Sequence, residues 1–184
     1  KHKAGADVNV LPVWKNYTTG SSNVTVAVVN GGIDQTHEDL AAACIGGRNF
    51  CGYGGEIVAH DHGTHVAGTI GAVNNNGIGV NGIAGGDAEK RIEGVRLLSA
   101  QIFQDGKSGG SGATALKWAC DNGANLANNS WGYDFDGDYD AAKYTPIPTS
   151  MRQAIDYFIK YAGCDNNGNQ LADSPMKGGL VFFA

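Results

Sequence analysis

Apolar residues gather in short runs separated by polar, glycine-rich stretches. The runs at 24–29 and 94–103 are apolar on both faces, as in a central parallel strand buried on both sides. The segments at 125–130 and 178–184 are predicted as a third and a fourth strand. The first run stops at Asn30, which two glycines follow. Such a strand-to-turn junction is where α/β enzymes tend to place a working side chain.

Three segments between these runs have helical features. Residues 62–73 are rich in small side chains, residues 111–122 have Ser111 as an N-cap, and residues 149–162 follow two prolines. Strands that alternate with helices predict an α/β domain with a doubly wound, largely parallel sheet. Residues 133–177, which are rich in Asp, Asn and Gly around the third helix, are predicted to form a surface excursion.

Length, composition and charge narrow the class of protein. The 184 residues fit one domain spanning 1–184, and the 29 glycines imply many tight turns. A formal net charge of −5, with no cluster of Lys and Arg, argues against binding to nucleic acid. No run approaches the roughly 18 apolar residues of a membrane-spanning helix, so no span is predicted.

The cysteines Cys44, Cys51, Cys120 and Cys164 show no C-x-x-C spacing, which argues against a zinc or redox site built from them. Their even number permits disulfides, and Cys44 and Cys51, which flank a glycine-rich loop, are one possible pair. Free buried thiols are the alternative, and the spacing does not decide between them.

The stretch HDHGTHVAGTI places His62 at the opening turn of a small-residue helix, where an imidazole can serve as a catalytic base. An alternative is a zinc site formed by His60, His62 and His65, in which His60 would have to fold back from the loop. Dinucleotide binding at Gly31-Gly32 is disfavoured because the third glycine of that fingerprint is missing.

Four blocks, VAVVNGGIDQTHEDL, HDHGTHVAGTI, NNNGIGVNGIAG and ANNSWG, together closely resemble the subtilisin-like serine proteases, the subtilases. Their order and spacing are compatible with that family. The resemblance implies a three-layer α/β/α fold with a mainly parallel central sheet. It also implies a serine endopeptidase in which Asp, His and Ser form the catalytic triad.

By this resemblance, His62 occupies the general-base position, and Asn30 stands where the family has its Asp. An amide carries no charge to stabilise an imidazolium ion, and we expect it to donate a hydrogen bond that holds the wrong His62 tautomer. In a serine protease of another fold, the same Asp-to-Asn change lowers kcat by about 10⁴. We therefore expect impaired catalysis. The alternative is that Asn30 only caps a turn.

The family's nucleophilic Ser lies in a Gly-Thr-Ser-Met-Ala-like block that this chain lacks, and Ser130 is not its equivalent. The chain stops at Ala184, inside a predicted strand that in the family leads to the oxyanion-hole Asn. We expect an N-terminal portion of a catalytic domain, incomplete at its C-terminus and inactive alone. A companion chain could supply the rest, or the chain is a fragment. The first rival function is a peptide-binding pseudoprotease or inactive subunit, and the second is a zinc hydrolase that uses the histidine cluster.

The resemblance also implies two substrate-binding segments. Ser130, Trp131 and Gly132 match the family's main-chain strand beside the S1 pocket, and Gly109 and Gly110 match a strand that pairs with extended peptides. The alternative for the glycine pair is a flexible surface loop before the 111–122 helix.

The loop NNNGIGV resembles the family's calcium site, whose ligands are carbonyl, amide and carboxylate oxygens. The matching positions are Asp39, Asn74, Asn76, Ile78 and Val80. A metal-free polar turn is the alternative. Structural calcium is the cofactor that we expect.

A second calcium candidate has EF-like spacing at Asp165, Asn167, Asn169 and Asp173, but Met176 stands where a bidentate Glu is required. The alternating acidic residues at 134–140 are interpreted as a solvated edge. A secreted or extracytoplasmic location is expected from the family resemblance, with weak support from the even cysteine count.

Overall fold

The computed structural model describes residues 5, 7–132 and 147–184. Its main sheet has the order β2-β5-β1-β6-β7, and every neighbouring pair is parallel. The strands are β1 (Thr25–Gly31), β2 (Cys44–Asn49), β5 (Arg96–Phe103), β6 (Leu126–Asn129) and β7 (Leu180–Phe183). The predicted parallel sheet is confirmed, with β1 at its centre.

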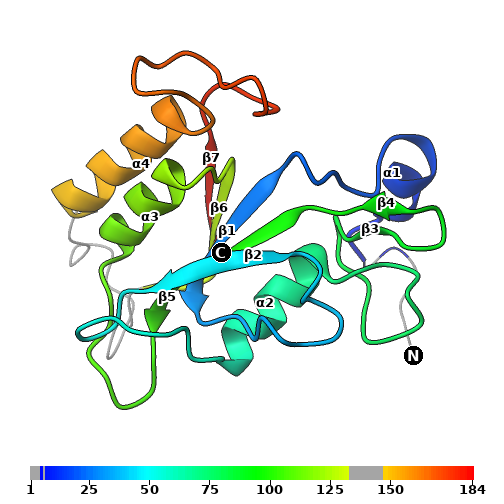
Figure 1. The fold of residues 1–184 in the computed structure, drawn as a ribbon, viewed down its shortest axis with the longest axis horizontal. Helices are drawn as coiled ribbons and strands as arrows, with labels where there is room; N and C mark the ends of the chain where they lie inside the picture. The colour runs from blue at the N-terminus through cyan, green and yellow to red at the C-terminus, as the bar shows by residue number, and fades with distance from the viewer. Residues whose placement is uncertain (1–4, 6, 133–146) are drawn as a thin grey trace.

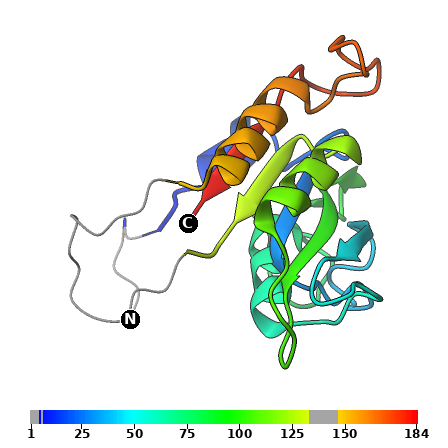
Figure 2. The same ribbon diagram turned by 90° about the vertical axis from the view of Figure 1, so that its left-hand side faces the viewer.

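Helices cover both faces of this sheet, as Figures 1 and 2 show. The helix α2 (Asp61–Gly71) lies on one face, and α3 (Gly112–Asp121) and α4 (Thr149–Tyr161) lie on the other. Alternate residues of β1 serve the two layers: Val26 and Val28 pack on the α2 side, and Ala27 and Val29 pack on the side of α3 and α4. The three-layer α/β/α architecture is therefore confirmed.

Several elements differ from those expected from sequence. The edge strand β2 was not predicted, because Gly46 and Gly47 interrupt its apolar pattern. Gly47 is required there, since a Cβ on it would lie 2.2 Å from the carbonyl oxygen of Ser99 on β5. The short helix α1 (Leu11–Asn16) and the hairpin of β3 (Gly86–Asp87) and β4 (Ile92–Glu93) were also missed. No helix among the described residues is both long and apolar enough to cross a membrane.

The helix α4 lies within the segment predicted as a surface excursion. Its Met151, Ala154 and Phe158 are buried in the core with residues of α3 and the sheet. The excursion therefore contains a helix that helps to close one layer of the domain.

The carboxyl ends of the parallel strands bring the candidate site together. Asn30, at the end of β1, is next to α2, whose first turn approaches the strand closely at Gly63. A Cβ on Gly63 would lie 2.1 Å from the carbonyl oxygen of Gly31, so only glycine permits this approach. The contact places the N-terminus of α2 against the end of β1, the region where α/β folds build their sites.

Candidate active site

The side chains of Asn30 and His62 meet at the junction of β1 and α2. His62 Nδ1 lies 2.8 Å from Asn30 Oδ1, within hydrogen-bond distance. Asn30 is 1% exposed, and the register of β1 against β5 shifts between Asn30 and Gly31. The structure thus brings together the two residues that the sequence assigns to the general base and its orienting partner.

The Asn30 carboxamide has two further partners, both from the main chain. Its Oδ1 accepts from the Gly31 N–H at 2.7 Å, and its Nδ2 donates to the carbonyl oxygen of Ser130 at 3.1 Å. The expectation that Asn30 donates to His62 was therefore wrong, since the donor nitrogen is directed at Ser130. Sequence reasoning could not foresee this, because Ser130 lies 100 positions away along the chain.

His60 holds the start of α2. It is the N-cap, and its Nδ1 accepts the main-chain N–H of His62 at 3.2 Å. The helix therefore begins at Asp61, one residue before the predicted start. Within the described part of the chain, no three His, Cys, Asp or Glu side chains converge as metal ligands, so the zinc arrangement of His60, His62 and His65 does not form.

Gln101 is a structural residue that sequence reasoning missed. Its side chain is fully buried, accepts from the Val58 N–H at 2.9 Å, and donates to the carbonyl oxygens of Val58 and Phe103, each at 3.0 Å. Residues 58–60, which lead into α2, are also anchored at His60, whose N–H donates to the Gly32 carbonyl oxygen at 2.9 Å. The segment leading into α2 is therefore held from two directions. A lone Gln within an apolar strand was the available signal.

The two predicted substrate segments both lie at the carboxyl ends of the parallel strands. Trp131 packs edge-on against Phe103 and Phe183, which end β5 and β7, with ring centroids 6.1 and 5.5 Å away. A Cβ on Gly112 would lie 3.0 Å from the Trp131 ring, so this ring also covers the start of α3. These contacts fix the Ser130–Gly132 segment beside the ends of three strands.

The glycine pair before α3 presents its main chain at the surface. Gly109 is exposed and Gly110 half-buried, and the Gly110 N–H donates to the carbonyl oxygen of Ile102 at 2.8 Å. The pair thus lies beside the end of β5, with Gly109 the more accessible of the two.

The predicted calcium loop surrounds one buried carboxylate. Asp39 is 1% exposed, and it accepts from Asn76 Nδ2 at 2.7 Å and from the Val80 N–H at 2.8 Å. Ile78 bonds to Asn76 through its N–H, whereas the Asn74 carbonyl oxygen accepts from the Ala88 N–H. The structure therefore groups Asp39, Asn76, Ile78 and Val80 directly, with Asn74 at the start of the same loop.

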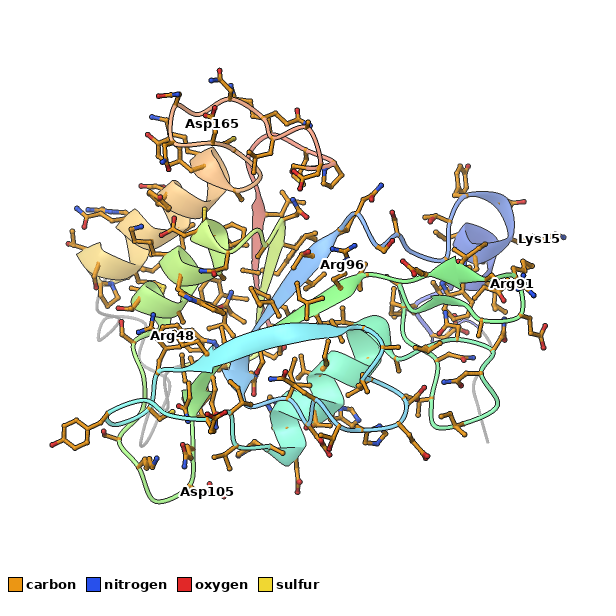
Figure 3. The ribbon with its side chains drawn as sticks, in the orientation of Figure 1. Lys15, Arg48, Arg91, Arg96, Asp105 and Asp165 are labelled. Atoms are coloured by element: carbon orange, nitrogen blue, oxygen red, sulfur yellow. The ribbon has the colours of Figure 1, made fainter. Side chains whose placement is uncertain are left out.

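The second calcium candidate is only partly assembled. Asp165, in the loop beyond α4 (Figure 3), accepts from the main-chain N–H groups of Asn167 and Asn169. These hydrogen bonds lower the pKa of the Asp165 carboxyl, and the one from the Asn169 N–H has the largest effect. Asp173 lines a different cavity, of about 330 Å³, from that beside Asp165. The acidic residues at 134–140 lie outside the described residues.

All four cysteines are free, so the pairing of Cys44 with Cys51 does not form in this structure. Burial, aided by the charge of Asp34, raises the pKa of the Cys44 thiol to about 11. Burial also raises the pKa of Cys120 to about 12, with the charge of Asp121 contributing. Thiols held neutral in this way are poor nucleophiles and poor metal ligands.

Known proteins share this sequence pattern over most of the chain. A model of the subtilase family matches residues 21–174. Fervidolysin from Fervidobacterium pennivorans is 32% identical over 186 residues, which cover 88% of this chain and 22% of that protein. Subtilisin BL from Lederbergia lenta is 42% identical over 125 residues, which cover 66% of this chain and 42% of that protein.

Solved structures agree with these sequence relationships. The psychrophilic subtilisin-like protease Apa1 from Pseudoalteromonas sp. AS-11 matches with a TM-score of 0.56 and 27% identity, over 82% of this chain and 30% of that one. The chain spans about a fifth to two fifths of the length of the relatives named above. These comparisons give no support to a companion chain. The family match and the shared fold together establish that the chain belongs to the subtilase family of subtilisin-like serine proteases.

Proposed function

We propose that the chain supplies the base-bearing part of a serine endopeptidase catalytic domain. The observation that carries this proposal is the 2.8 Å contact between His62 Nδ1 and Asn30 Oδ1 at the carboxyl end of the central strand. In peptide-bond hydrolysis, His62 would take the proton of a nucleophilic Ser and return it to the leaving amine. Asn30 would hold the imidazole in place.

The exposed main chain of Gly109 and the Ser130–Gly132 segment would bind an extended peptide by main-chain hydrogen bonds. The nucleophilic Ser and the oxyanion-hole Asn would come from polypeptide outside these 184 residues. The chain by itself would therefore bind substrate without cutting it. Asn30 further lowers the expected rate, because a neutral amide does not stabilise the imidazolium that forms during proton transfer.

A fluorophosphonate probe, which labels activated serines, tests this proposal. We expect no label on the 184-residue chain, and label on the longest product that its gene expresses. His62→Ala should abolish that label, whereas His65→Ala, a matched change on the same helix, should retain most of it. Label on the short chain, or label that survives His62→Ala, would contradict the proposal.

One observation favours a second function, a peptide-binding pseudoprotease: position 30 carries an amide in place of the family's carboxylate. Calorimetric titration with extended peptides separates the two functions. Binding to the longest gene product without cleavage over days, and without fluorophosphonate label, would support the pseudoprotease. Turnover that depends on His62 would exclude it.

The proposal includes a structural calcium ion in the loop around Asp39. Asp39 is almost fully buried, and the two ion pairs among the described residues involve Asp87 and Asp121 instead. A buried carboxylate without a cationic partner is costly. Gly79 has φ +58°, and a Cβ on it would lie 2.0 Å from Asp39 Oδ2, so the loop closes tightly on this oxygen.

These features fit a hard cation bound by the Asp39 carboxylate, the Asn76 side chain and the carbonyl oxygens of Asn74, Ile78 and Val80. The ion would brace the loop that follows α2. A second ion at Asp165, Asn167, Asn169 and Asp173 is a weaker part of the proposal, since the described contacts do not join Asp173 to the others.

We also propose a location outside the cytoplasm, on the family resemblance alone. Fractionation of the source cells, with detection of the protein in the medium or envelope, tests this location.

A further inference from the structure

Two main-chain groups fix the orientation of the Asn30 carboxamide independently of His62. The Gly31 N–H donates to Oδ1, and the Ser130 carbonyl oxygen accepts from Nδ2. Half a turn of the carboxamide would direct Nδ2 at the Gly31 N–H and Oδ1 at the Ser130 oxygen. Both contacts would then join groups of like polarity around a side chain that is 1% exposed. The observed orientation is therefore strongly preferred.

This orientation decides which nitrogen of neutral His62 carries the proton. An amide oxygen only accepts hydrogen bonds, and Asn30 Oδ1 lies 2.8 Å from Nδ1. The contact is a hydrogen bond only when the proton is on Nδ1. A neutral imidazole has one N–H, so Nε2 then keeps its lone pair and can accept a proton.

We propose that Asn30, locked by Gly31 and Ser130, is a positioning residue that selects the base-competent tautomer of His62 without a carboxylate. The catalytic meaning of this selection rests on the proposed function, but the tautomer is a property of the chain itself. Relative to an Asp, the site loses the negative charge and keeps the tautomer.

The lock depends on an amide. Aspartate has no hydrogen to donate to the Ser130 carbonyl, and its second oxygen would face that oxygen at about the 3.1 Å that separates the present pair. The contact between Asn30 and Ser130 is therefore one that this sequence gains from its departure at position 30. It also joins the base to the segment proposed to bind substrate.

The preference should be large enough to measure. In the other tautomer, the Nδ1 lone pair would face Asn30 Oδ1, and one hydrogen bond would be lost at a contact that is buried on the Asn30 side only. The net worth of such a bond, about 1–1.5 kcal/mol, corresponds to a preference of about tenfold for the Nδ1–H form.

Nitrogen-15 NMR of the labelled 184-residue chain measures this preference directly. At about pH 8.5, roughly two units above the ordinary pKa of imidazole, neutral rings dominate. For His62, we expect a pyrrole-type signal for Nδ1 and a pyridine-type signal for Nε2. The reverse assignment, or averaged signals from comparable populations, would overturn the inference.

Two variants at position 30 separate a lock from a passive contact. Asn30→Asp should retain the Nδ1–H form, because a carboxylate also accepts from Nδ1. Asn30→Leu should lose the preference by about tenfold, since leucine has no acceptor. The signals of His65, on the same helix, should stay unchanged and thereby report that α2 remains folded. If the leucine variant does not fold, the tautomer of His62 in the unmodified chain still decides the question.

This result is separable from that of the labelling experiment. The Nδ1–H form without fluorophosphonate labelling of the longest gene product would contradict the proposed protease activity only. Labelling with His62 in the Nε2–H form would contradict the tautomer selection only.

Discussion

Replacing Gln101 with leucine should destabilise the segment that leads into α2. Leucine is slightly larger than glutamine, so the change leaves no cavity, but it removes three hydrogen bonds. The Val58 N–H, the Val58 carbonyl and the Phe103 carbonyl lose their partner. An unsatisfied buried polar group costs about 1–3 kcal/mol. Val58 and Phe103 are 45% and 39% exposed, which places each cost at the low end because water can reach part of these groups.

The expected loss is therefore about 2–3 kcal/mol of unfolding free energy, or about 5–10 °C in Tm for a chain of this size. Urea unfolding followed by circular dichroism gives the free energy. Gln153→Leu, on an exposed position of α4, is the matched control and should stay within about 0.5 kcal/mol of the parent chain.

Hydrogen exchange supplies the local readout of the same experiment. The His60 N–H, which donates to the Gly32 carbonyl, should exchange faster in Gln101→Leu, with smaller changes in α3. Gln101→Leu could instead unfold at the same urea concentration as Gln153→Leu and protect the His60 N–H from exchange as well as that control does. In that case, the Gln101 hydrogen bonds do not hold the segment that leads into α2, and the reasoning is wrong.

Three further predictions concern packing, pH and metal binding. Gly63→Ala should push α2 away from β1 and lower the free energy of unfolding, measured with urea, by about 1–3 kcal/mol. The same change should abolish the preference of His62 for the Nδ1–H tautomer, as measured by NMR. Because burial raises the native pKa values of Cys44 and Cys120 to about 11 and about 12, the unfolded chain releases these protons first, near its ordinary pKa of 9.0. Their contribution should be complete below about pH 9 and decline above it, and replacing both with alanine should flatten the stability curve between about pH 9 and pH 12. Calcium should raise Tm, and Asp39→Asn should abolish most of that shift whereas Asp165→Asn retains it; an equal shift in both variants would refute the assignment of the main site.

Local patterns in the sequence predicted most of the regular structure. The branched run before Asn30 and the run that ends at Phe103 became β1 and β5, and Ser111 caps α3 through a hydrogen bond from the Thr114 N–H. These features depend on neighbours in the chain, which a reader of the sequence can see.

The features that escaped prediction depend on contacts between distant segments. Gly47 looked unlike a strand residue, yet its missing side chain is what lets β2 approach Ser99. Gln101 looked like a polar defect in an apolar strand, and its carboxamide satisfies the main chain of a loop 43 positions away. The direction of the Asn30 carboxamide follows from where the Ser130 carbonyl lies, which only the folded sheet determines.

The central place of β1 has a consequence for how the protein is made. Its strand partners begin at Arg96 and Leu126, and the Asn30 side chain bonds to a carbonyl 100 residues later. Such non-local pairing slows folding. At a synthesis rate of about 5–20 residues per second, the apolar strand waits about 5–20 s on the ribosome before its last partner emerges. During that interval β1 has no strand partners, and unpaired apolar strands are prone to aggregate. The central position that buries Asn30 in the finished sheet therefore leaves β1 exposed longest during synthesis.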